Sequence, residues 1–265
     1  MTLQPSSKVI VFTDIHIDVD QRPDAPNAED RLRAGIQHVM AHQSDADRVI
    51  ITGDLTHHGD IASYERLRAL LTPLKLPTHL MLGNHDNREN FLHVFPDTAT
   101  DPNGFVQCVT DTPDTRLVLL DTLFGPPYDY PASHAGKLCD QRLNWLEHAM
   151  TGTENPCVLF MHHPPMPTGF AAMDSIMLQD AGAFYEATNR AGGARHLICG
   201  HIHRTISGTH RGLSYSMFKS FVGQMPMNFV TIDTKTEVHE PPAYGILLTT
   251  SQGLVVHFED FLLDT

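Results

Sequence analysis

Five short polar clusters in this sequence hold residue types that bind metal ions, and each follows an apolar run. They are, in chain order, Asp14-Ile15-His16, Gly53-Asp54, Gly83-Asn84-His85-Asp86, His162-His163-Pro164-Pro165 and Gly200-His201-Ile202-His203. A mixture of imidazole, carboxylate and amide oxygen suits first-row ions such as Mn²⁺, Fe²⁺, Co²⁺ or Zn²⁺. It contains too much nitrogen for Ca²⁺ or Mg²⁺. We therefore predict one metal site that is assembled from five loops.

Seven of these side chains are expected to be ligands, namely Asp14, His16, Asp54, Asn84, His162, His201 and His203. Seven ligands are too many for one ion and suit two ions that share a bridging carboxylate. Such a pair can clamp a phosphoryl group for in-line attack. Taken singly, Asp-x-His is typical of a solvated turn and Gly-Asp is common turn chemistry. The shared position at strand ends, where sites form in open α/β sheets, favours the metal interpretation.

The apolar runs before the clusters are predicted to be buried strands. In the first third of the chain these are Val9–Phe12, Val49–Thr52 and Thr78–Leu82. Helices are expected between them, with Asn27 and Asp60 as their N-caps. This alternation of strand and helix predicts a parallel sheet.

The rest of the chain has a different rhythm. Residues 105–110 and 116–121 are predicted to form an antiparallel pair, followed by a helix that Asp140 caps and a second helix near Ser175–Arg190. Further strands are predicted at 157–161, 196–199, 205–209, 213–217, 229–233, 244–249 and 254–258. The strands after Arg204 are expected to make a second, largely antiparallel sheet. Two mixed sheets flanked by helices then give a four-layer α/β/β/α sandwich.

Length and composition limit the possible classes. The 265 residues predict a single domain over 1–265, in which the strands and tail of 234–265 rim the pocket or contact another subunit. The net charge of −13 disfavours binding of a nucleic acid polymer. No apolar run is long enough to span a membrane. Four cysteines without a CxxC pair, and no signal peptide, predict reduced thiols and a cytoplasmic location.

Taken together, the five clusters resemble the signature of the calcineurin-like metallophosphoesterases: D-x-H, G-D, G-N-H-D, H-H-P-P and G-H-x-H, in this order over residues 14–203. Within that superfamily the chain is similar to bacterial class III cyclic nucleotide phosphodiesterases and the related glycerophosphodiesterases. Three features carry this similarity: G-D-x-x-x-x-G with Tyr64 downstream, Met166 and Met173-Asp174 after H-H-P-P, and the stretch from Gly136 to Leu146 with Trp145.

The resemblance implies a role for each matching residue. Asp14, His16 and His203 would hold one ion, Asn84, His162 and His201 the other, and Asp54 would bridge them. His85 would contact the substrate and help the leaving group depart, with Asp86 orienting it. Asn84 and His203 would also contact the substrate.

Three further histidines are tentative substrate contacts. His57 and His58 occupy a segment where the family commonly has an aspartate, and His163 either contacts substrate or lies behind the ligands. His134 lies on a loop that could rim the pocket, and a surface position is favoured for it.

The function implied by the resemblance is hydrolysis of a small phosphodiester, most notably a 3′,5′-cyclic nucleotide, by a hydroxide that bridges two divalent ions. The ions would be Mn²⁺ and/or Fe²⁺, with Zn²⁺ or Co²⁺ as alternatives. Alternative activities are a glycerophosphodiesterase, or a broad-specificity phosphodiesterase or phosphomonoesterase. A non-enzymatic scaffold is disfavoured because every ligand position is filled. A homodimer or larger homo-oligomer is also expected.

Overall fold

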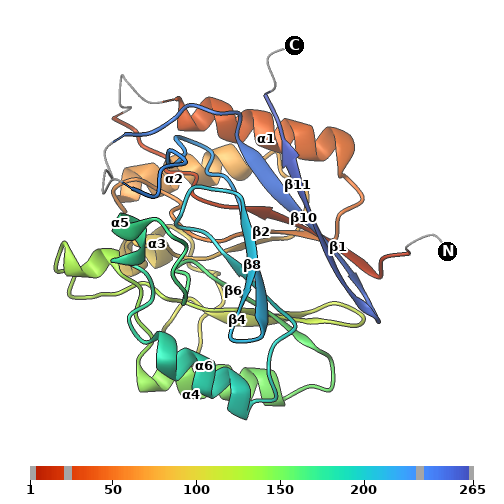
Figure 1. Ribbon diagram of the computed structural model, residues 1–265. Helices are drawn as coiled ribbons and strands as arrows, with labels where there is room; N and C mark the ends of the chain where they lie inside the picture. Colours follow the sequence, from red (N-terminus) through yellow and green to blue (C-terminus); the bar gives the residue numbers. More distant parts are fainter. Residues whose placement is uncertain (1–3, 21–25, 231–235, 263–265) are drawn as a thin grey trace.

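Two mixed β-sheets lie face to face, and helices cover the outer face of each sheet (Figure 1). The computed structural model describes residues 4–20, 26–230 and 236–262. The predicted four-layer α/β/β/α arrangement is confirmed. No helix in these described ranges is long and apolar enough to cross a membrane.

The first sheet has five strands in the order β11-β10-β1-β2-β3. Its strands are β1 (Ser7–Phe12), β2 (Arg48–Ile51), β3 (Thr78–Leu80), β10 (Ala243–Thr250) and β11 (Gly253–Asp260). β1, β2 and β3 run parallel, whereas β10 is antiparallel to β1, with Ser7 opposite Thr249. The parallel strands therefore end at one edge of the sheet.

The second sheet has six strands in the order β4-β5-β6-β7-β9-β8. Its strands are β4 (Cys108–Asp111), β5 (Arg116–Leu119), β6 (Cys157–Met161), β7 (His196–Cys199), β8 (Ile206–His210) and β9 (Leu213–Met217). β5, β6, β7 and β9 are parallel, and the two edge strands β4 and β8 are antiparallel to their neighbours.

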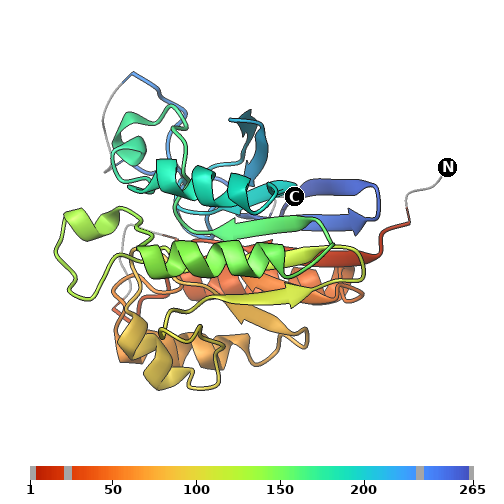
Figure 2. The same cartoon turned by 90° about the horizontal axis from the view of Figure 1, so that it is seen from below.

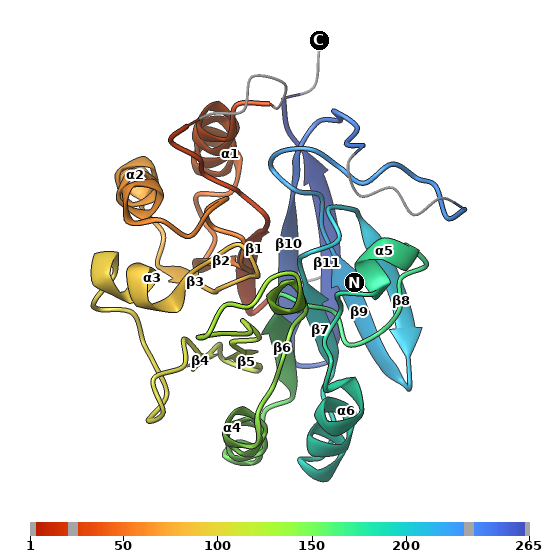
Figure 3. The same ribbon diagram turned by 90° about the vertical axis from the view of Figure 1, so that its left-hand side faces the viewer.

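Helices cover the two outer faces. On one side lie α1 (Ala28–His42), α2 (Ile61–Leu71) and α3 (Arg88–Val94); on the other lie α4 (Asp140–Thr151) and α6 (Ala181–Arg190) (Figure 3). Seen from below, α4 and α6 lie in front of the strands (Figure 2). Two short helices, η1 (Ala132–His134) and α5 (Ala171–Asp174), belong to loops. The predicted caps are confirmed: the side chains of Asn27 and Asp60 accept from main-chain N–H groups three residues on.

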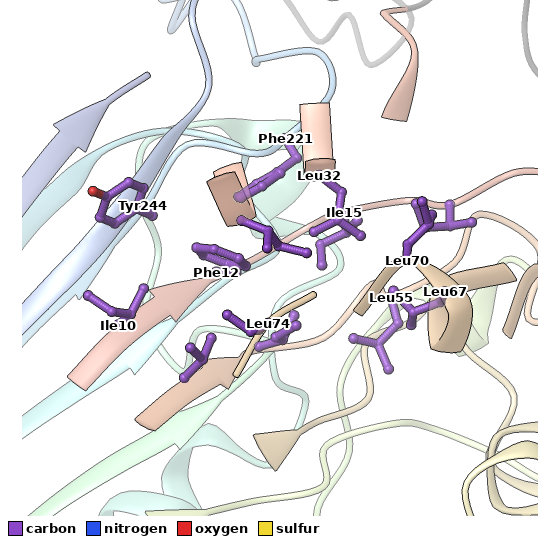
Figure 4. Close-up of a cluster of buried hydrophobic side chains, with 14 of the residues drawn as sticks. Ile10, Phe12, Ile15, Leu32, Leu55, Leu67, Leu70, Leu74, Phe221 and Tyr244 are labelled. Atoms are coloured by element: carbon purple, nitrogen blue, oxygen red, sulfur yellow. The ribbon is translucent and has the colours of Figure 1, made fainter. Parts of the chain in front are cut away.

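Alternate residues of the strands point into different layers of the core, as the pleat of a strand requires. Ile10 and Phe12 of β1 pack toward α1 and α2, and Val9 and Val11 pack between the two sheets. Figure 4 shows the helix-side layer, in which the rings of Phe12 and Phe221 lie 4.9 Å apart. The β1 backbone is thus fixed from both faces, so the residues that follow it start from a rigid point.

Several details differ from the prediction. The strands after Arg204 do not form a sheet of their own, because β8 and β9 join the second sheet and β10 and β11 join the first. Helix α3 was not predicted. Asp140 is the first residue of α4 rather than its cap, which is Cys139. The helix expected from Ser175 begins at Ala181, and residues 231–233 of the strand expected at 229–233 lie outside the described residues.

Candidate metal centre and substrate cavity

The five polar clusters meet at one edge of the two sheets. Loops after β1 and β2 are joined by main-chain hydrogen bonds, Asp14 N to Gly53 O at 3.1 Å and His16 N to Asp54 O at 2.9 Å. The loop after β7 is tied to the same point, because the His201 amide donates to the Asp14 carboxylate at 3.1 Å. The strand ends of both sheets therefore contribute side chains to a single site.

One group of four side chains could hold a first ion. The ligand atoms of Asp14, His16, Asp54 and His203 all lie within 4.8 Å of one another. Nε2 of His16 is 3.1 Å from Nε2 of His203, which is 3.4 Å from Oδ1 of Asp14. Two imidazole nitrogens this close, beside two carboxylates, are the arrangement expected around a shared cation.

A second group lies beside the first. Nε2 of His162 is 3.2 Å from Oδ1 of Asn84 and 3.4 Å from Oδ2 of Asp54. The ligand atoms of His162, His163 and His201 lie within 4.8 Å of one another. Because Oδ2 of Asp54 is also 3.6 Å from Nε2 of His16, this carboxylate lies next to both groups.

The residues present fit a dinuclear metal centre. Nε2 of His201 is buried and has no hydrogen-bond partner among the described residues. Such a nitrogen carries a desolvation cost that a metal bond would offset. The donors combine imidazole, carboxylate and an amide oxygen, the set that first-row ions prefer.

The main chain around the site is held in an uncommon conformation. Five of the seven predicted ligands have positive φ angles: Asp14 (50°), His16 (52°), Asp54 (48°), His201 (74°) and His203 (54°). Residues other than glycine rarely adopt this left-handed region, and such strain concentrates at functional sites. Gly83 is needed for a different reason, because a Cβ there would collide with Oδ1 of Asp54. The backbone is shaped to turn these side chains toward one point.

Main-chain carbonyls orient the imidazoles. Nδ1 of His162 donates to Thr52 O at 3.0 Å, and Nδ1 of His203 donates to Gly223 O at 2.9 Å. Each hydrogen bond leaves Nε2 as the ring nitrogen that faces the other metal-binding side chains. Partners of this kind fix the tautomer and raise the basicity of a metal-binding histidine.

Burial and neighbouring charges together shift the pKa values of the side chains in this site. Burial alone would raise the pKa of Asp14, but His203 and His162 outweigh it and lower that pKa to about 2. Burial would lower the pKa of His162, yet Asp54 and Asp14 raise it to about 9. Burial and the neighbouring His162 lower the pKa of His201 to about 3. Without metal, the carboxylates are therefore charged and hold a proton on His162.

His85 and Asp86 do not interact as predicted. Nδ1 of His85 donates to the main-chain oxygen of His57 at 2.8 Å. The Asp86 carboxylate accepts instead from the amides of Leu55 and Gly83 and from the hydroxyl of Tyr64. Asp86 is thus a buried anchor of the loops, and burial followed by the charge of Asp54 raises its pKa to about 6. The expectation that Asp86 orients His85 is wrong, because its oxygens are occupied elsewhere.

A cavity of about 550 Å³ opens above the two groups. Its polar lining includes six histidines with Asp54 and Asn84: His16, His57, His85, His134, His201 and His203. Its apolar lining consists of Ala172, Met173, Ile176, Val222 and Met225. Glu237 also lines the cavity. The cavity therefore combines metal-binding side chains with apolar side chains and a carboxylate.

Two further residues matter here. His134, for which the surface was favoured over the pocket rim, lines the cavity, and its Nδ1 is 3.5 Å from Nδ2 of Asn84. Arg88 binds both carboxylate oxygens of Asp121, at 2.7 and 2.9 Å, and the carbonyl of Leu123 at 3.1 Å. Arg88 anchors the start of the loop that brings His134 to the cavity.

The three tentative substrate contacts are placed differently. His57 lines the cavity, whereas His58 and His163 are not among the residues that line it. His163 is fully buried, with Nδ1 2.7 Å from Oγ1 of Thr122. It lies behind the ligands, which was the alternative left open for it.

Comparison with known proteins identifies the family. A model described as "Calcineurin-like phosphoesterase" matches residues 7–205. The chain belongs to this family. The predicted family and its hydrolase class are thereby confirmed for this calcineurin-like phosphoesterase.

Curated relatives of this phosphoesterase carry related names. A "Probable cyclic nucleotide phosphodiesterase" of Rhodopseudomonas palustris is 36% identical over 260 residues, covering 97% of this chain and 93% of the relative. A "3',5'-cyclic adenosine monophosphate phosphodiesterase" of Vibrio vulnificus is 29% identical, covering 78% and 74%. A "Glycerophosphodiester phosphodiesterase" of Enterobacter lignolyticus is 30% identical, covering 68% and 64%.

Solved structures support the fold of this phosphoesterase. A dimetal phosphatase from Danio rerio superimposes with a TM-score of 0.72 at 16% identity, covering 97% of both chains. A purple acid phosphatase from yellow lupin has a TM-score of 0.65 at 14% identity, covering 97% of this chain and 52% of the other.

Proposed function

We propose that this protein is a dinuclear-metal phosphodiesterase that hydrolyses small phosphodiesters, with 3′,5′-cyclic nucleotides as its substrates. The observation that carries the proposal is the position of Asp54, whose carboxylate lies 3.4 Å from His162 and 3.6 Å from His16, one in each group of metal-binding side chains. The name of the relative that is 36% identical supports the substrate class.

The proposed ligands follow from the two groups. Asp14, His16 and His203 hold one ion, Asn84, His162 and His201 the other, and Asp54 belongs to both. When bound, the ions would neutralise phosphate oxygens and lower the pKa of coordinated water. Mn²⁺ and Fe²⁺ are proposed, and the same donors accept Zn²⁺ or Co²⁺.

The remaining polar residues position and stabilise the substrate. His85 lines the cavity with Nδ1 committed to His57 O, so Nε2 is the nitrogen that can meet a leaving-group oxygen. Proton transfer from such a group is general acid catalysis. Asn84, His203 and His57 line the same wall and are the proposed contacts to the phosphate.

The apolar wall favours a nucleotide over a glycerol ester. Met173, Ile176 and Met225 face a cavity of about 550 Å³, and apolar or polarisable side chains bind flat aromatic groups well. A nucleobase offers such a group, whereas a glycerol head group does not. The predicted contribution of 234–265 to the pocket rim is supported at Glu237.

We also propose a cytoplasmic location and a homo-oligomeric assembly. All four cysteines are free, which suits a reducing compartment such as the cytoplasm. The proposed homo-oligomer draws support from Met227, Phe229 and Val230, exposed to 59, 59 and 91% beside the cavity loops.

The decisive experiment compares substrates on metal-stripped protein that has been reloaded with Mn²⁺. 3′,5′-Cyclic AMP, a glycerophosphodiester and p-nitrophenyl phosphate are assayed in parallel, with wild type and Met225→Ala. The proposal predicts turnover of cyclic AMP above the other two, and a raised KM for cyclic AMP alone in the variant. Preferred turnover of the glycerophosphodiester would favour the alternative activity. Loss of all turnover with two ions bound would refute an enzymatic role.

A further inference from the structure

A third group of metal-binding side chains lies outside the two groups described above. The loops after β1 and β2 run side by side, with Ile17 N bonded to Leu55 O at 3.1 Å and His57 N bonded to Ile17 O at 2.9 Å. This parallel bridge brings Asp18 beside the adjacent histidines His57 and His58. The backbone of both loops is therefore fixed by hydrogen bonds rather than by the side chains themselves.

The geometry of this group suits a cation. Asp18, His57 and His58 each offer one ligand atom, and these atoms all lie within 4.8 Å of one another. Nε2 of His58 is 3.8 Å from Oδ2 of Asp18. The other oxygen of Asp18 accepts from the amide of Asp20 at 2.9 Å, which holds the carboxylate in place. Asp18 is nearly buried, whereas the His58 side chain is 60% exposed, so an ion has a path from solvent.

We propose that Asp18, His57 and His58 bind a third divalent ion directly beside the dinuclear centre, since Nδ1 of His57 lies 3.5 Å from Nδ1 of His16. Two imidazoles and one carboxylate with an open fourth position form a common donor set for Zn²⁺. The proposed reaction involves His57 but not His58. A third metal site would assign a role to both histidines.

The third site is adjacent to the proposed reaction machinery. The ring of His57 stacks on that of His85, with centroids 5.0 Å apart and planes 22° apart. Its carbonyl oxygen also accepts from His85. An ion bound to the His57 ring would restrain both the stacking on His85 and the hydrogen bond from His85. We therefore expect activity to change further when more than two equivalents of metal are bound.

The test counts ions and does not depend on activity. Metal-stripped full-length protein is equilibrated with excess Zn²⁺ and freed of unbound ion, and zinc per chain is measured by mass spectrometry. The wild type is expected to hold three ions. The double variant Asp18→Asn/His58→Gln is expected to hold two. It keeps the size of both side chains and leaves His57 in place.

A matched control removes a different exposed histidine. His148 lies on α4, far from the loops after β1 and β2, and His148→Gln is expected to retain three ions. Two ions in the double variant would also show that the dinuclear centre is intact, which excludes general unfolding. Two ions in the wild type, or three in the double variant, would overturn the proposal without bearing on the phosphodiesterase activity.

Discussion

Nδ1 of the His85 imidazole donates a hydrogen bond to the main-chain carbonyl oxygen of His57, at 2.8 Å. The bond places a proton on Nδ1 and leaves Nε2 available in the cavity that His85 lines. A carbonyl does not change charge with pH, so this orientation persists across the working range.

His85→Ala is expected to lower kcat for cyclic AMP by about 10²–10⁴-fold, the usual contribution of a general acid. The loss should be smaller for bis(p-nitrophenyl) phosphate, because p-nitrophenolate departs without protonation. Steady-state kinetics with both substrates measure the difference. His93→Ala, at an exposed position of α3, is the control. An equal loss on both substrates, with two ions bound, would argue that His85 does not protonate the leaving group.

Asp54→Asn is expected to remove at least one of the two ions of the dinuclear centre, because its carboxylate lies next to both groups. Activity should fall by at least about 10³-fold, since metal ions contribute several kcal/mol to transition-state stabilisation. Metal content and kcat are measured together. Asp97→Asn makes the same chemical change at an exposed position and should alter neither. Full metal loading and activity in Asp54→Asn would contradict a bridging role.

Tyr64→Phe tests whether the hydrogen bonds of Tyr64 to Asp86 and Asn87 stabilise the loops below the site. The buried hydroxyl donates to Asp86 at 2.9 Å and accepts from the Asn87 amide at 2.9 Å. Its removal leaves a buried amide unpaired, which costs about 1–3 kcal/mol of unfolding free energy. Urea denaturation measures this loss, and metal content should stay the same. Tyr185→Phe is the control and should not destabilise the protein, because this buried hydroxyl has no hydrogen-bond partner among the described residues. Unchanged stability in Tyr64→Phe would show that the anchor is not needed.

The contribution of His162 to the stability of the metal-free protein should be lost as the pH rises from 6.5 to 9. The pKa of His162 is about 9 in the folded state and near 6.5 when unfolded. A raised pKa stabilises the fold fully below the unfolded value, and this contribution disappears as the pH passes the folded value. The shift corresponds to something on the order of 3 kcal/mol.

The measurement compares unfolding free energies of wild type and His162→Gln, both in EDTA, at pH 6.5 and 9. The difference between the two proteins should shrink as the pH rises. The pH dependence of the unfolding free energy has the opposite sign for Asp14. Its pKa is lowered to about 2, so its stabilising contribution is lost only in acid. A difference that is constant from pH 6.5 to 9 would show that His162 does not carry the proton.

Glu237→Gln should increase hydrolysis of monoesters relative to diesters. The carboxylate lines the cavity and lies against Gly223, whose carbonyl oxygen accepts from His203. A phosphomonoester carries about one more negative charge than a diester at neutral pH. Removing a negative group from the wall therefore favours the monoester, by several-fold in kcat/KM. Glu186→Gln on α6 is the control, and an unchanged ratio in Glu237→Gln would exclude this role.

The strand ends and their ligand types could be predicted because both signals are local. An apolar run followed by Asp-x-His or Gly-Asn-His-Asp marks a strand end and its chemistry in one short stretch. The N-caps Asn27 and Asp60 were predictable for the same reason, because a cap depends on neighbours only three residues away.

The missed features depend on contacts between distant parts of the chain. That β10 pairs with β1 rather than with β9 is decided by packing across the molecule. The hydrogen-bond partner of His85 was misassigned because Asp86 is adjacent in sequence, whereas its oxygens face the end of β2. His134 could not be placed without knowing where its loop is anchored.

The place of β10 in the first sheet has a consequence for biosynthesis. β1 lies between β2 and β10, and Ser6 and Thr249, which are joined by a hydrogen bond, are 243 positions apart in the chain. The segments between β1 and β10 leave the ribosome before β10 does, so the strand that leads to Asp14 stays unpaired on one side until β10 has been made. Metal loading should therefore follow synthesis, and a nascent chain that lacks β10 should not retain its ions.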